Sequence, residues 1–316
     1  MQSRALGLVI GFAADRIFGD PRRFHPVAGF GRLASFVERR LYADDARRGV
    51  AHTALLVGST GLLGLAVERT TAQRPVLRVA ATAATTWTVL GGRSLGREAE
   101  AVHAHLAAGD LPAARQQLTH LVGRDTSELD ADEIARATIE SVAENTSDAV
   151  VAPLVVGAVG GIGGLVAYRA TNTLDAMVGH RNARYENFGW ASARLDDALN
   201  IPGSRLTAGL VALLAPMIGG SPRAAWTVWR RDTKHHPSPN AGPVEASFAG
   251  ALGITLGGVN RYGDRVENRN TLGSGPTATV RDIDRSVRLA GYVGMGAIVT
   301  AALIAARPRR QPRRRR

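Results

Sequence analysis

Three long stretches without a charged side chain constrain this sequence more than any other feature. Residues 50–67, 149–168 and 289–306 contain no Asp, Glu, Lys or Arg over 18, 20 and 18 positions. About 20 apolar residues in a helix span the ~30 Å hydrocarbon core of a bilayer. A soluble protein could bury one such helix in its core, but three of them favour an all-α, polytopic integral membrane protein.

Three weaker apolar segments extend this prediction. Residues 5–14, 75–92 and 206–220 are shorter, or are interrupted by a charge or a proline. We read the first as an uncleaved, partly inserted helix, because no A-x-A cleavage site follows it. The sequence therefore predicts one membrane-embedded catalytic unit over residues 1–316, with six membrane segments joined by helical polar loops.

Glycines at the centre of the second uncharged stretch bear on how it crosses the membrane. Gly160, Gly161, Gly163 and Gly164 surround a single isoleucine, and glycine weakens a helix interior. If all polar loops lie on one side, residues 149–168 cannot cross once, and the glycines would break them into a re-entrant hairpin. The alternative is a straight span that places successive loops on opposite sides.

The net charge of +12 is unevenly distributed. Residues 307–316 hold seven Arg and no acidic residue, and without them the net charge falls to +5. The positive-inside rule then predicts that the C-terminal tail of this cell (inner) membrane protein lies in the cytoplasm.

An aromatic content of 5% argues against a protein that reads nucleic acid by stacking on its bases. The absence of Cys excludes disulfides, thiolate metal sites and a Cys nucleophile.

The polar segments carry four groups of reactive side chains, and the first follows residues 5–14. Asp15 and Asp20 flank a glycine, and His25 precedes a proline. The pattern is that of a turn with carboxylates at its rim, or simply of a helix that ends at glycine and proline.

The second group joins Arg124 to a helix that carries Glu140, Glu144, Asn145 and Asp148. The three acids are four residues apart, so they would share one helix face and repel one another unless a cation compensates. Asp148 directly precedes the second uncharged stretch, where ionisable groups are costly and tend to be functional. Such oxygen ligands suit Mg²⁺.

The third group lies between two membrane segments. Asn172, Asp175, His180, Asp196 and Asp197 fall within thirty residues that are also rich in Arg. These carboxylates and the imidazole could bind a metal or exchange protons, although a lone histidine is more often structural.

The fourth group forms a loop that Pro and Gly keep from being a regular helix. It contains Arg231, Lys234, His235 and Asn240, with Glu245 beyond. Lys234 is the only lysine in the chain, and its compact ammonium can do what Arg cannot. The loop has the composition of an anion-binding or catalytic loop.

Residues 266–280 are polar and are expected to form a loop. There is no P-loop, dinucleotide fingerprint, G-x-S-x-G or H-E-x-x-H motif.

Long motifs in these groups resemble the CobD/CbiB family of cobalamin biosynthesis. They read D-x-x-x-G-D-P…H-P (15–26), G-R-D-T (123–126), S-V-A-E-N-T-S-D…A-P-L (141–154), N-T-L-D-A-M-V-G-H…Y…F-G-W-A-S-A-R-L-D-D (172–197) and K-H-H-P-S-P-N-A-G-x-x-E-A (234–246). The resemblance implies a polytopic membrane protein that makes adenosylcobinamide phosphate. The implied reaction is an ATP- and Mg²⁺-dependent amide ligation of adenosylcobyric acid with aminopropanol or its O-phosphate. The two departures, residues 266–280 and the Arg-rich tail, lie outside the motifs.

Residue chemistry suggests a role for each position that these motifs mark. Expected partners are the corrinoid and amino-alcohol phosphate substrates, the lipid bilayer and other cobalamin-assembly enzymes, with no nucleic acid. The catalytic loops are expected on the cytoplasmic side. The roles are Mg²⁺ binding for Glu144, Asp148, Asp175, Asp196 and Asp197; catalysis for Asn145, His180, Lys234 and His235; and substrate binding for Asp15, Asp20, His25, Arg124, Asn172, Arg231, Asn240 and Glu245.

A transporter or sensor on the same scaffold is the alternative function. A transporter should bury ionisable groups at mid-membrane. Here the apolar segments are free of charge and the acids lie in loops and at segment ends, which favours an enzyme at the membrane interface.

Overall fold

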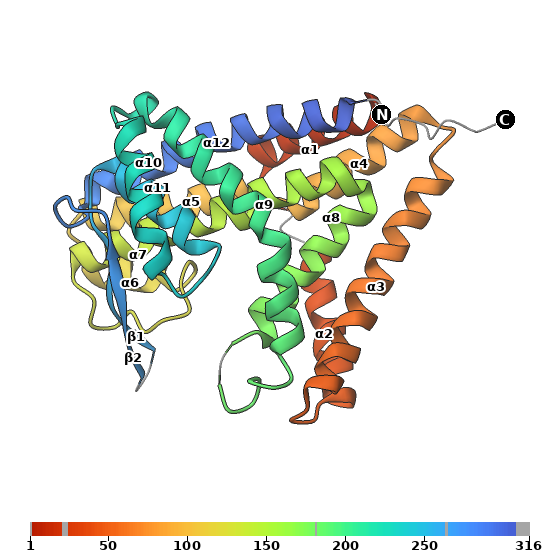
Figure 1. The fold of residues 1–316 in the computed structure, drawn as a ribbon, viewed down its shortest axis with the longest axis horizontal. Coiled ribbons are helices and arrows are strands. Elements are labelled where there is room, and N and C mark those ends of the chain that lie inside the picture. The colour runs from red at the N-terminus through yellow and green to blue at the C-terminus, as the bar shows by residue number, and fades with distance from the viewer. Residues whose placement is uncertain (1, 21–24, 181, 263–264, 308–316) are drawn as a thin grey trace.

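The computed structural model describes residues 2–20, 25–180, 182–262 and 265–307 of this largely helical chain (Figure 1). The elements are α1 (Gln2–Phe18), α2 (Pro26–Leu41), α3 (Ala46–Thr70), α4 (Pro75–Val89), α5 (Gly92–Ala107), α6 (Leu111–Leu118), α7 (Ala131–Thr146), the π-helical turn η1 (Ser147–Val151), α8 (Ala152–Val178), α9 (Trp190–Leu214), the 3₁₀ turn η2 (Ala215–Ile218), α10 (Pro222–Asp232), the 3₁₀ turn η3 (Thr233–His235), α11 (Ala241–Leu252), β1 (Leu256–Tyr262), β2 (Arg265–Leu272) and α12 (Val280–Ala306). The prediction of an all-α protein with helical polar loops is confirmed.

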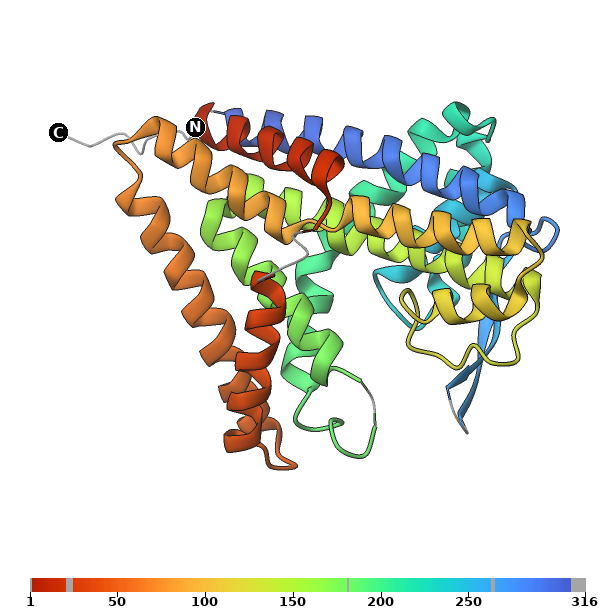
Figure 2. The ribbon, with the colours of Figure 1, turned by 180° about the vertical axis from the view of Figure 1, so that it is seen from behind.

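The helices form two arms that meet at a bend in α8 (Figures 1 and 2). One arm contains α1, α4, α12 and the first half of α8, and it continues into α5, α7, α10 and α11. The other contains α2, α3, the second half of α8 and the first half of α9. Helix α1 begins, and helix α12 ends, at the same end of the molecule.

Within the described residues, four helical segments are long and apolar enough to cross a membrane: α3, α7 to α8, α9 to η2, and α12. They include all three uncharged stretches. Helix α3 turns Leu55, Leu62 and Leu63 outward, and α12 does so with Val299 and Leu303. Apolar surface of this extent is typical of lipid contact and not of a soluble monomer. The fold is that of a polytopic membrane protein. Helices α1 and α4, with 17 and 15 residues, are shorter than a usual span.

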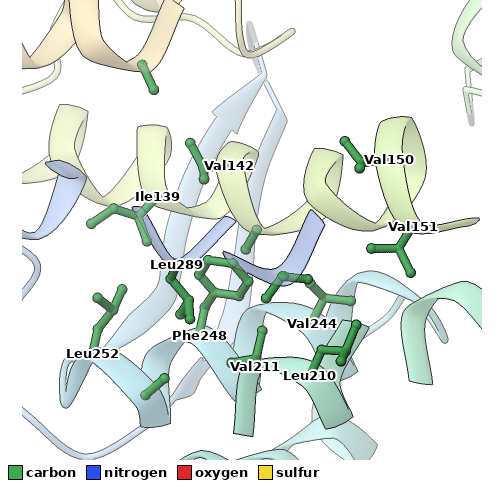
Figure 3. Close-up of a cluster of buried hydrophobic side chains, with 14 of the residues drawn as sticks. Ile139, Val142, Val150, Val151, Leu210, Val211, Val244, Phe248, Leu252 and Leu289 are labelled. Carbon is green, nitrogen blue, oxygen red and sulfur yellow. The ribbon is translucent and has the colours of Figure 1, made fainter. Parts of the chain in front are cut away.

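The core of the first arm surrounds α11. Every residue of this helix is buried, as expected for a helix that is apolar on nearly all sides; its one charged side chain is Glu245. Figure 3 shows Phe248 of α11 among Ile139 of α7, Val211 of α9 and Leu289 of α12. Packing of α7, α9, α11 and α12 therefore fixes the relative positions of the segments that carry the second, third and fourth polar groups.

Helix α8 breaks at Gly161, as the glycine cluster suggested. Its φ of 65° and ψ of −149° lie in a region that is open almost only to glycine. The two halves then pack against each other, because Gly157 lies against Leu165 and Gly164 against Val156. Re-entry of this bend into a membrane stays a prediction.

A half-buried ionic cluster satisfies the main chain at this break. Arg4 donates to the carbonyls of Ala158 (3.2 Å) and Val159 (3.0 Å), which end the first half of α8. Glu68 pairs with Arg4 at 2.5 Å and with Arg78 at 2.8 Å. The cluster thereby ties α1, α3 and α4 to the bend.

One expectation for the fold is wrong. Residues 266–272 were expected to lie in a loop, but they belong to β2, which pairs antiparallel with β1 from Leu256↔Leu272 to Tyr262↔Arg265. These residues show no apolar alternation, so they carry no recognisable strand pattern. The main-chain pairing with β1 determines their conformation.

Candidate functional site

Carboxylates from separate elements gather where η1, α8 and α9 meet. The side chain of Asp148 in η1 lies within electrostatic range of Glu144 at the end of α7, Asp175 on α8 and Asp196 on α9. Asp197 lies within electrostatic range of both Asp175 and Asp196. The five residues that the sequence suggests as Mg²⁺ ligands are therefore neighbours in the fold.

Glu140 does not belong to this group, although the sequence spacing placed it on the same helix face. It is buried, pairs with Arg124 at 3.3 Å and accepts a hydrogen bond of 2.8 Å from the main-chain N–H of Gly257. Asp148 lies in a π-helical turn, which inserts an extra residue into a helix and is frequent at functional sites. The regular spacing from Glu144 to Asp148 is therefore broken.

A chain of hydrogen bonds orients Asp196. The Tyr168 hydroxyl donates to the main-chain carbonyl of Asp148 at 2.7 Å and lies 2.6 Å from Oδ1 of Asn200. Nδ2 of Asn200 donates to Oδ2 of Asp196 at 2.8 Å. Because Tyr168, Asn200 and Asp196 are all buried, these bonds are shielded from water and hold η1, α8 and α9 together.

A guanidinium group is linked to the carboxylates through Asn172. Nη1 of Arg169 is 3.3 Å from Oδ1 of Asn172, to which it donates, and Arg169 interacts electrostatically with Asp20. Asn172 also interacts with the carboxyl group of Asp196. Nε of Arg169 and the Oδ1 atoms of Asp20 and Asp196 are buried without a hydrogen-bond partner in the described part of the chain. Buried polar atoms of this kind are costly unless a ligand or water satisfies them.

Asp15 occupies a separate position at the start of α5. It is fully buried, and its Oδ2 accepts a hydrogen bond of 3.3 Å from the main-chain N–H of Arg93. It thereby caps a helix whose own N-cap residue, Gly91, has no side chain. Burial, reinforced by the Asp20 carboxylate, raises the pKa of Asp15 to about 6. Its Oδ1 atom is buried without a hydrogen-bond partner among the described residues.

The loop at residues 233–240 is anchored on α9. Nδ2 of Asn240 donates to the main-chain carbonyl of Asp197 at 2.8 Å. Oδ1 of Asn240 accepts from Ser204 at 3.0 Å and from Arg205 at 3.2 Å. Asn240 thus joins this loop to the helix that carries Asp196 and Asp197.

The same loop buries a histidine–carboxylate pair. Nε2 of His236 lies 3.6 Å from Oε2 of Glu245, and both side chains are 2% exposed. The main-chain N–H of Ser238 donates to Nδ1 of His236 at 3.1 Å. Lys234 is exposed. The side chain of His235, which the sequence suggested as catalytic, lies outside the described residues.

Two other predicted site residues, His25 and Asn145, form hydrogen bonds with residues close to them in the sequence. His25 is the N-cap of α2, and its Nδ1 accepts from the main-chain N–H of Val27 at 3.2 Å. Nδ2 of Asn145 donates to the carbonyl of Ser141, one turn earlier in α7, at 2.9 Å. Asn145 is half-buried next to Glu144, at the end of α7 that leads into η1.

Arg231 and His180 lie on the outside of the candidate site. Nε of Arg231 pairs with Oδ1 of Asp232 at 2.5 Å, and Arg231 is half-exposed. Nε2 of His180 is 2.8 Å from the carbonyl of Ala176, and its side chain is exposed at the end of α8 within electrostatic range of Asp175. Both residues therefore face solvent and remain accessible to a substrate.

The residues present fit Mg²⁺ that arrives with a substrate. In the described part of the chain, no group of three or more His, Asp or Glu side chains is arranged to hold a metal ion. Mg²⁺, however, usually takes only one or two protein carboxylates and completes its shell with water and substrate phosphate. Oδ1 of Asp196, which has no hydrogen-bond partner among the described residues, suits that mode, with Asp175 and Asp197 within electrostatic range. Magnesium binding stays a prediction.

Four residues join the site without having been assigned a role from the sequence: Tyr168, Arg169, Asn200 and His236. Tyr168 ends the second uncharged stretch and Arg169 follows it, and such residues commonly mark a membrane interface there. Asn200 lies one helical turn after Asp196, and this spacing was a usable signal. His236 adjoins His235, and only burial reveals its pairing with Glu245.

Comparison with known proteins gives a consistent result. A family model described as "CobD/Cbib protein" matches residues 8–290. The "Cobalamin biosynthesis protein CobD" of Mycobacterium tuberculosis is 49% identical over 308 residues, which cover 98% of each chain. Proteins of the same name are 46% identical in Chromobacterium violaceum, over 95% of each chain, and 46% identical in Geobacter metallireducens, over 82% of this chain and 83% of the relative. No solved structure matches. The family match includes every polar group described above.

Proposed function

The chain belongs to the CobD/CbiB family, and on that premise we propose that it is an ATP-dependent ligase of cobalamin biosynthesis. It joins adenosylcobyric acid to aminopropanol or its O-phosphate. The names of the relatives support a role in cobalamin biosynthesis. The observation that carries the ligase proposal is the carboxylate cluster around Asp148 and Asp196. In it, Oδ1 of Asp196 has no hydrogen-bond partner among the described residues, and Asn172 links Asp196 to the Arg169 guanidinium.

The reaction makes an amide from a carboxylate, which must first be activated. The γ-phosphoryl group of ATP passes to an oxygen of the corrinoid carboxylate, giving an acyl phosphate and ADP. The amine nitrogen then attacks the acyl carbon, the bond from that carbon to the phosphate oxygen breaks, and the amine gives up a proton as inorganic phosphate leaves. Catalysis of phosphoryl transfer is mostly positioning and charge stabilisation, which suits a site built from charged side chains.

The carboxylates at the helix junction are proposed to hold Mg²⁺ with the nucleotide phosphates. Asp148 lies within electrostatic range of Glu144, Asp196 and Asp175, and Asp196 lies within range of Asp175 and Asp197. When bound, the metal ion would neutralise charge on the phosphate oxygens. The hydrogen bond from Asn200 orients Asp196 for this task.

The remaining roles follow from position and chemistry. Lys234 is exposed on the loop that Asn240 joins to α9, so it can reach a phosphate near the carboxylates. Arg124 and Arg231 already pair with carboxylates, so they would share their guanidinium groups with a phosphate. The other proposed roles are proton acceptance from the amine by His180 or His235, substrate orientation by Asn145 and Asn240, and substrate contact by Asp15, Asp20, His25, Asn172 and Glu245.

The proposed location is the cell membrane, with the catalytic loops and the C-terminus in the cytoplasm. ATP is a cytoplasmic substrate, which requires the phosphate-binding side chains to face that compartment. The Arg-rich residues 307–316 support the same orientation through the positive-inside rule.

Direct turnover by the purified protein tests the proposal. The full chain in detergent is incubated with adenosylcobyric acid, aminopropanol phosphate and MgATP, and the amide product and ADP are measured by mass spectrometry. We expect one ADP per amide formed. Neither ATP turnover nor amide would instead favour a transporter or sensor on the same scaffold.

A matched pair of variants links turnover to the carboxylate cluster. Asp196→Asn should lower kcat at least about tenfold and raise the Mg²⁺ concentration needed for half-maximal rate. Asp284→Asn makes the same change in an exposed ion pair with Arg288 on α12 and should leave both values unchanged. Equal rates for the two variants would remove Asp196 from the catalytic site.

A further inference from the structure

Helix α10 directly follows a candidate membrane span and leaves one of its own faces uncovered. The span from α9 to η2 ends at Ile218, and α10 begins at Pro222. Near its end this span turns Leu213 and Met217 outward, with exposed fractions of 69% and 57%. Apolar exposure on a membrane span indicates lipid contact, so α10 starts close to lipid.

The packing of α9 on α12 places the start of α10 near the edge of the apolar layer. A Cβ added at Gly296 of α12 would lie 2.9 Å from the side chain of Leu210 and 3.5 Å from that of Leu214. Beyond these contacts α9 runs toward the end of the molecule where α12 begins (Figures 1 and 2). The uncharged stretch of α12 starts there with Leu289, directly after Arg288. Helix α9 therefore ends near the depth at which α12 leaves the apolar layer.

Tight packing on α11 fixes which side of α10 is uncovered. Ala225 is buried, and a Cβ added at Gly250 of α11 would lie only 2.7 Å from its Cα. The exposed side carries Arg223, Trp226 and Arg230. Residues three and four apart share a helix face, so these three side chains form one surface, the outer face of α10.

The positive charge of the outer face has no counter-charge in the described part of the chain. Neither Arg223 nor Arg230 forms an ion pair with a described carboxylate. The only acidic residue of α10, Asp232, is buried and pairs with Arg231. Two guanidinium groups in this state favour an anionic partner, and their planar forks match the oxygens of a phosphate.

An exposed tryptophan between the two arginines indicates the class of that partner. Trp226 is 51% exposed, and its ring centroid lies 4.9 Å from that of Trp229 in an edge-to-face pair. Tryptophan gathers at the level of the lipid headgroups, where one part of the ring contacts the apolar layer and the N–H meets water. An acidic soluble protein would neutralise the arginines, but it would not explain why the outer face lies at the edge of a membrane span.

We propose that the outer face of α10 binds the headgroups of anionic phospholipids. Arg223 and Arg230 are about 10 Å apart along the helix axis, so each can bind the phosphate of a different headgroup. The Trp226 ring then inserts between the two lipids. The proposal does not depend on the ligase function, because none of these three side chains has a role in the proposed reaction.

Quenching of tryptophan fluorescence by brominated lipids tests the proposal in a bilayer. The full chain is reconstituted into vesicles of phosphatidylcholine and phosphatidylglycerol at a fixed ratio, with the bromine carried by equal amounts of one lipid or the other. Both lipids should quench Trp226, and brominated phosphatidylglycerol should do so at least about twofold more, because arginines near a membrane surface attract anionic lipid. The preference should shrink at high salt.

Variants assign the preference to the three side chains. The quenching lost in Trp226→Phe is the contribution of Trp226. Arg223→Gln combined with Arg230→Gln should keep the quenching by brominated phosphatidylcholine and lose the preference for phosphatidylglycerol, whereas Arg223→Lys combined with Arg230→Lys keeps the charge and should keep the preference. Arg69→Gln removes an exposed arginine at the end of α3, far from α10 (Figure 1), and should be quenched as the wild-type protein is.

Three results would overturn the proposal. The first is equal quenching of Trp226 by the two lipids, and the second is a preference that survives the loss of both arginines. The third is that neither lipid quenches Trp226, which would mean that the outer face meets water or a soluble partner. The melting temperatures of the glutamine and lysine variants should equal that of the wild-type protein, since the arginines are exposed, so unfolding would not account for a lost preference.

Discussion

Nδ2 of Asn240 donates a hydrogen bond of 2.8 Å to the main-chain carbonyl of Asp197. The contact joins a loop and a helix that are 43 residues apart in sequence, and it sets Lys234 and His236 relative to Asp196. Two candidate groups that the sequence presents separately are therefore parts of one site. Substitution of Asn240 therefore tests whether the anchored loop contributes to the site.

Loss of the Asn240 side chain should impair turnover more than stability. Asn240→Ala removes the bonds to Asp197 and Ser204, so we expect a loss of about 1–3 kcal/mol of stability and a fall in kcat/KM of at least about tenfold. Asn187→Ala removes a comparable bond of 2.9 Å to Asp44 on an exposed loop and serves as the control. If Asn240→Ala retained full kcat/KM, the loop would not contribute to the site.

A methyl group at the bend in α8 should destabilise the protein. Gly161→Ala places a Cβ at φ 65° and against the Glu68 carboxylate, so we expect a loss of at least about 2 kcal/mol. Gly160→Ala is the matched control, because nothing lies within 4 Å of its added Cβ. The melting temperatures of both variants in detergent measure the effect. Equal melting temperatures would mean that the bend is not required for stability.

The stability of the protein should depend on the ionisation of Asp15. Its pKa of about 6 in the folded chain exceeds the ordinary value of 3.8 for an Asp side chain, so between these values the folded state binds more protons than the unfolded state. The free energy of unfolding therefore falls as pH rises through this window, by about 3 kcal/mol in total. The penalty is absent below about pH 4 and complete above about pH 6.

Asp15→Asn isolates this contribution. Asparagine keeps an oxygen for the main-chain N–H of Arg93 but does not ionise, so the variant should melt higher than the wild-type protein at about pH 7.5 and show a clearly smaller difference at about pH 4.5. Asp284→Asn, an exposed position, should not change the difference between the two pH values. An unchanged pH profile for Asp15→Asn would contradict the explanation.

The membrane fold was readable from local sequence because its signal is local. Residues 50–67, 149–168 and 289–306 show no charge over their whole length, and lipid accepts no other arrangement of main-chain polar groups than helices or closed barrels. The break at Gly161 was also indicated by its neighbouring glycines. The strand at residues 265–272 carried no such signal, because its conformation depends on pairing with β1.

The site was only partly readable because its members meet through tertiary packing. The sequence marked Asp148, Asp175 and Asp196 by residue type, and the fold brings them together. It gave no reason to select Arg169, which reads as an interface residue after an apolar stretch. The sequence also could not show that Glu140 pairs with Arg124. Glu140, Glu144 and Asp148 are spaced four residues apart, and this spacing does not distinguish Glu140 from the other two.

Removal of one hydroxyl should loosen the hydrogen-bond chain behind Asp196. Tyr168→Phe removes the donor to the carbonyl of Asp148 and the contact with Asn200, and Tyr168 is 1% exposed. Unsatisfied buried partners cost about 1–3 kcal/mol, and kcat should fall because Asp196 loses its fixed orientation. Tyr42→Phe removes an exposed hydroxyl that donates to the carbonyl of Arg184 at 3.0 Å and should change neither quantity.

The only lysine provides the last test, because its substitution can keep the charge while changing the geometry. Lys234 is exposed on the anchored loop, and an ammonium is a compact point charge whereas a guanidinium is a planar fork. We expect Lys234→Arg to raise the KM for ATP about threefold to tenfold, and Lys234→Gln to raise it further because the charge is lost. Arg230→Gln removes a nearby exposed charge on α10 and should leave the KM for ATP unchanged. If the KM for ATP of Lys234→Gln equalled that of the wild-type protein, Lys234 would have no part in phosphate binding.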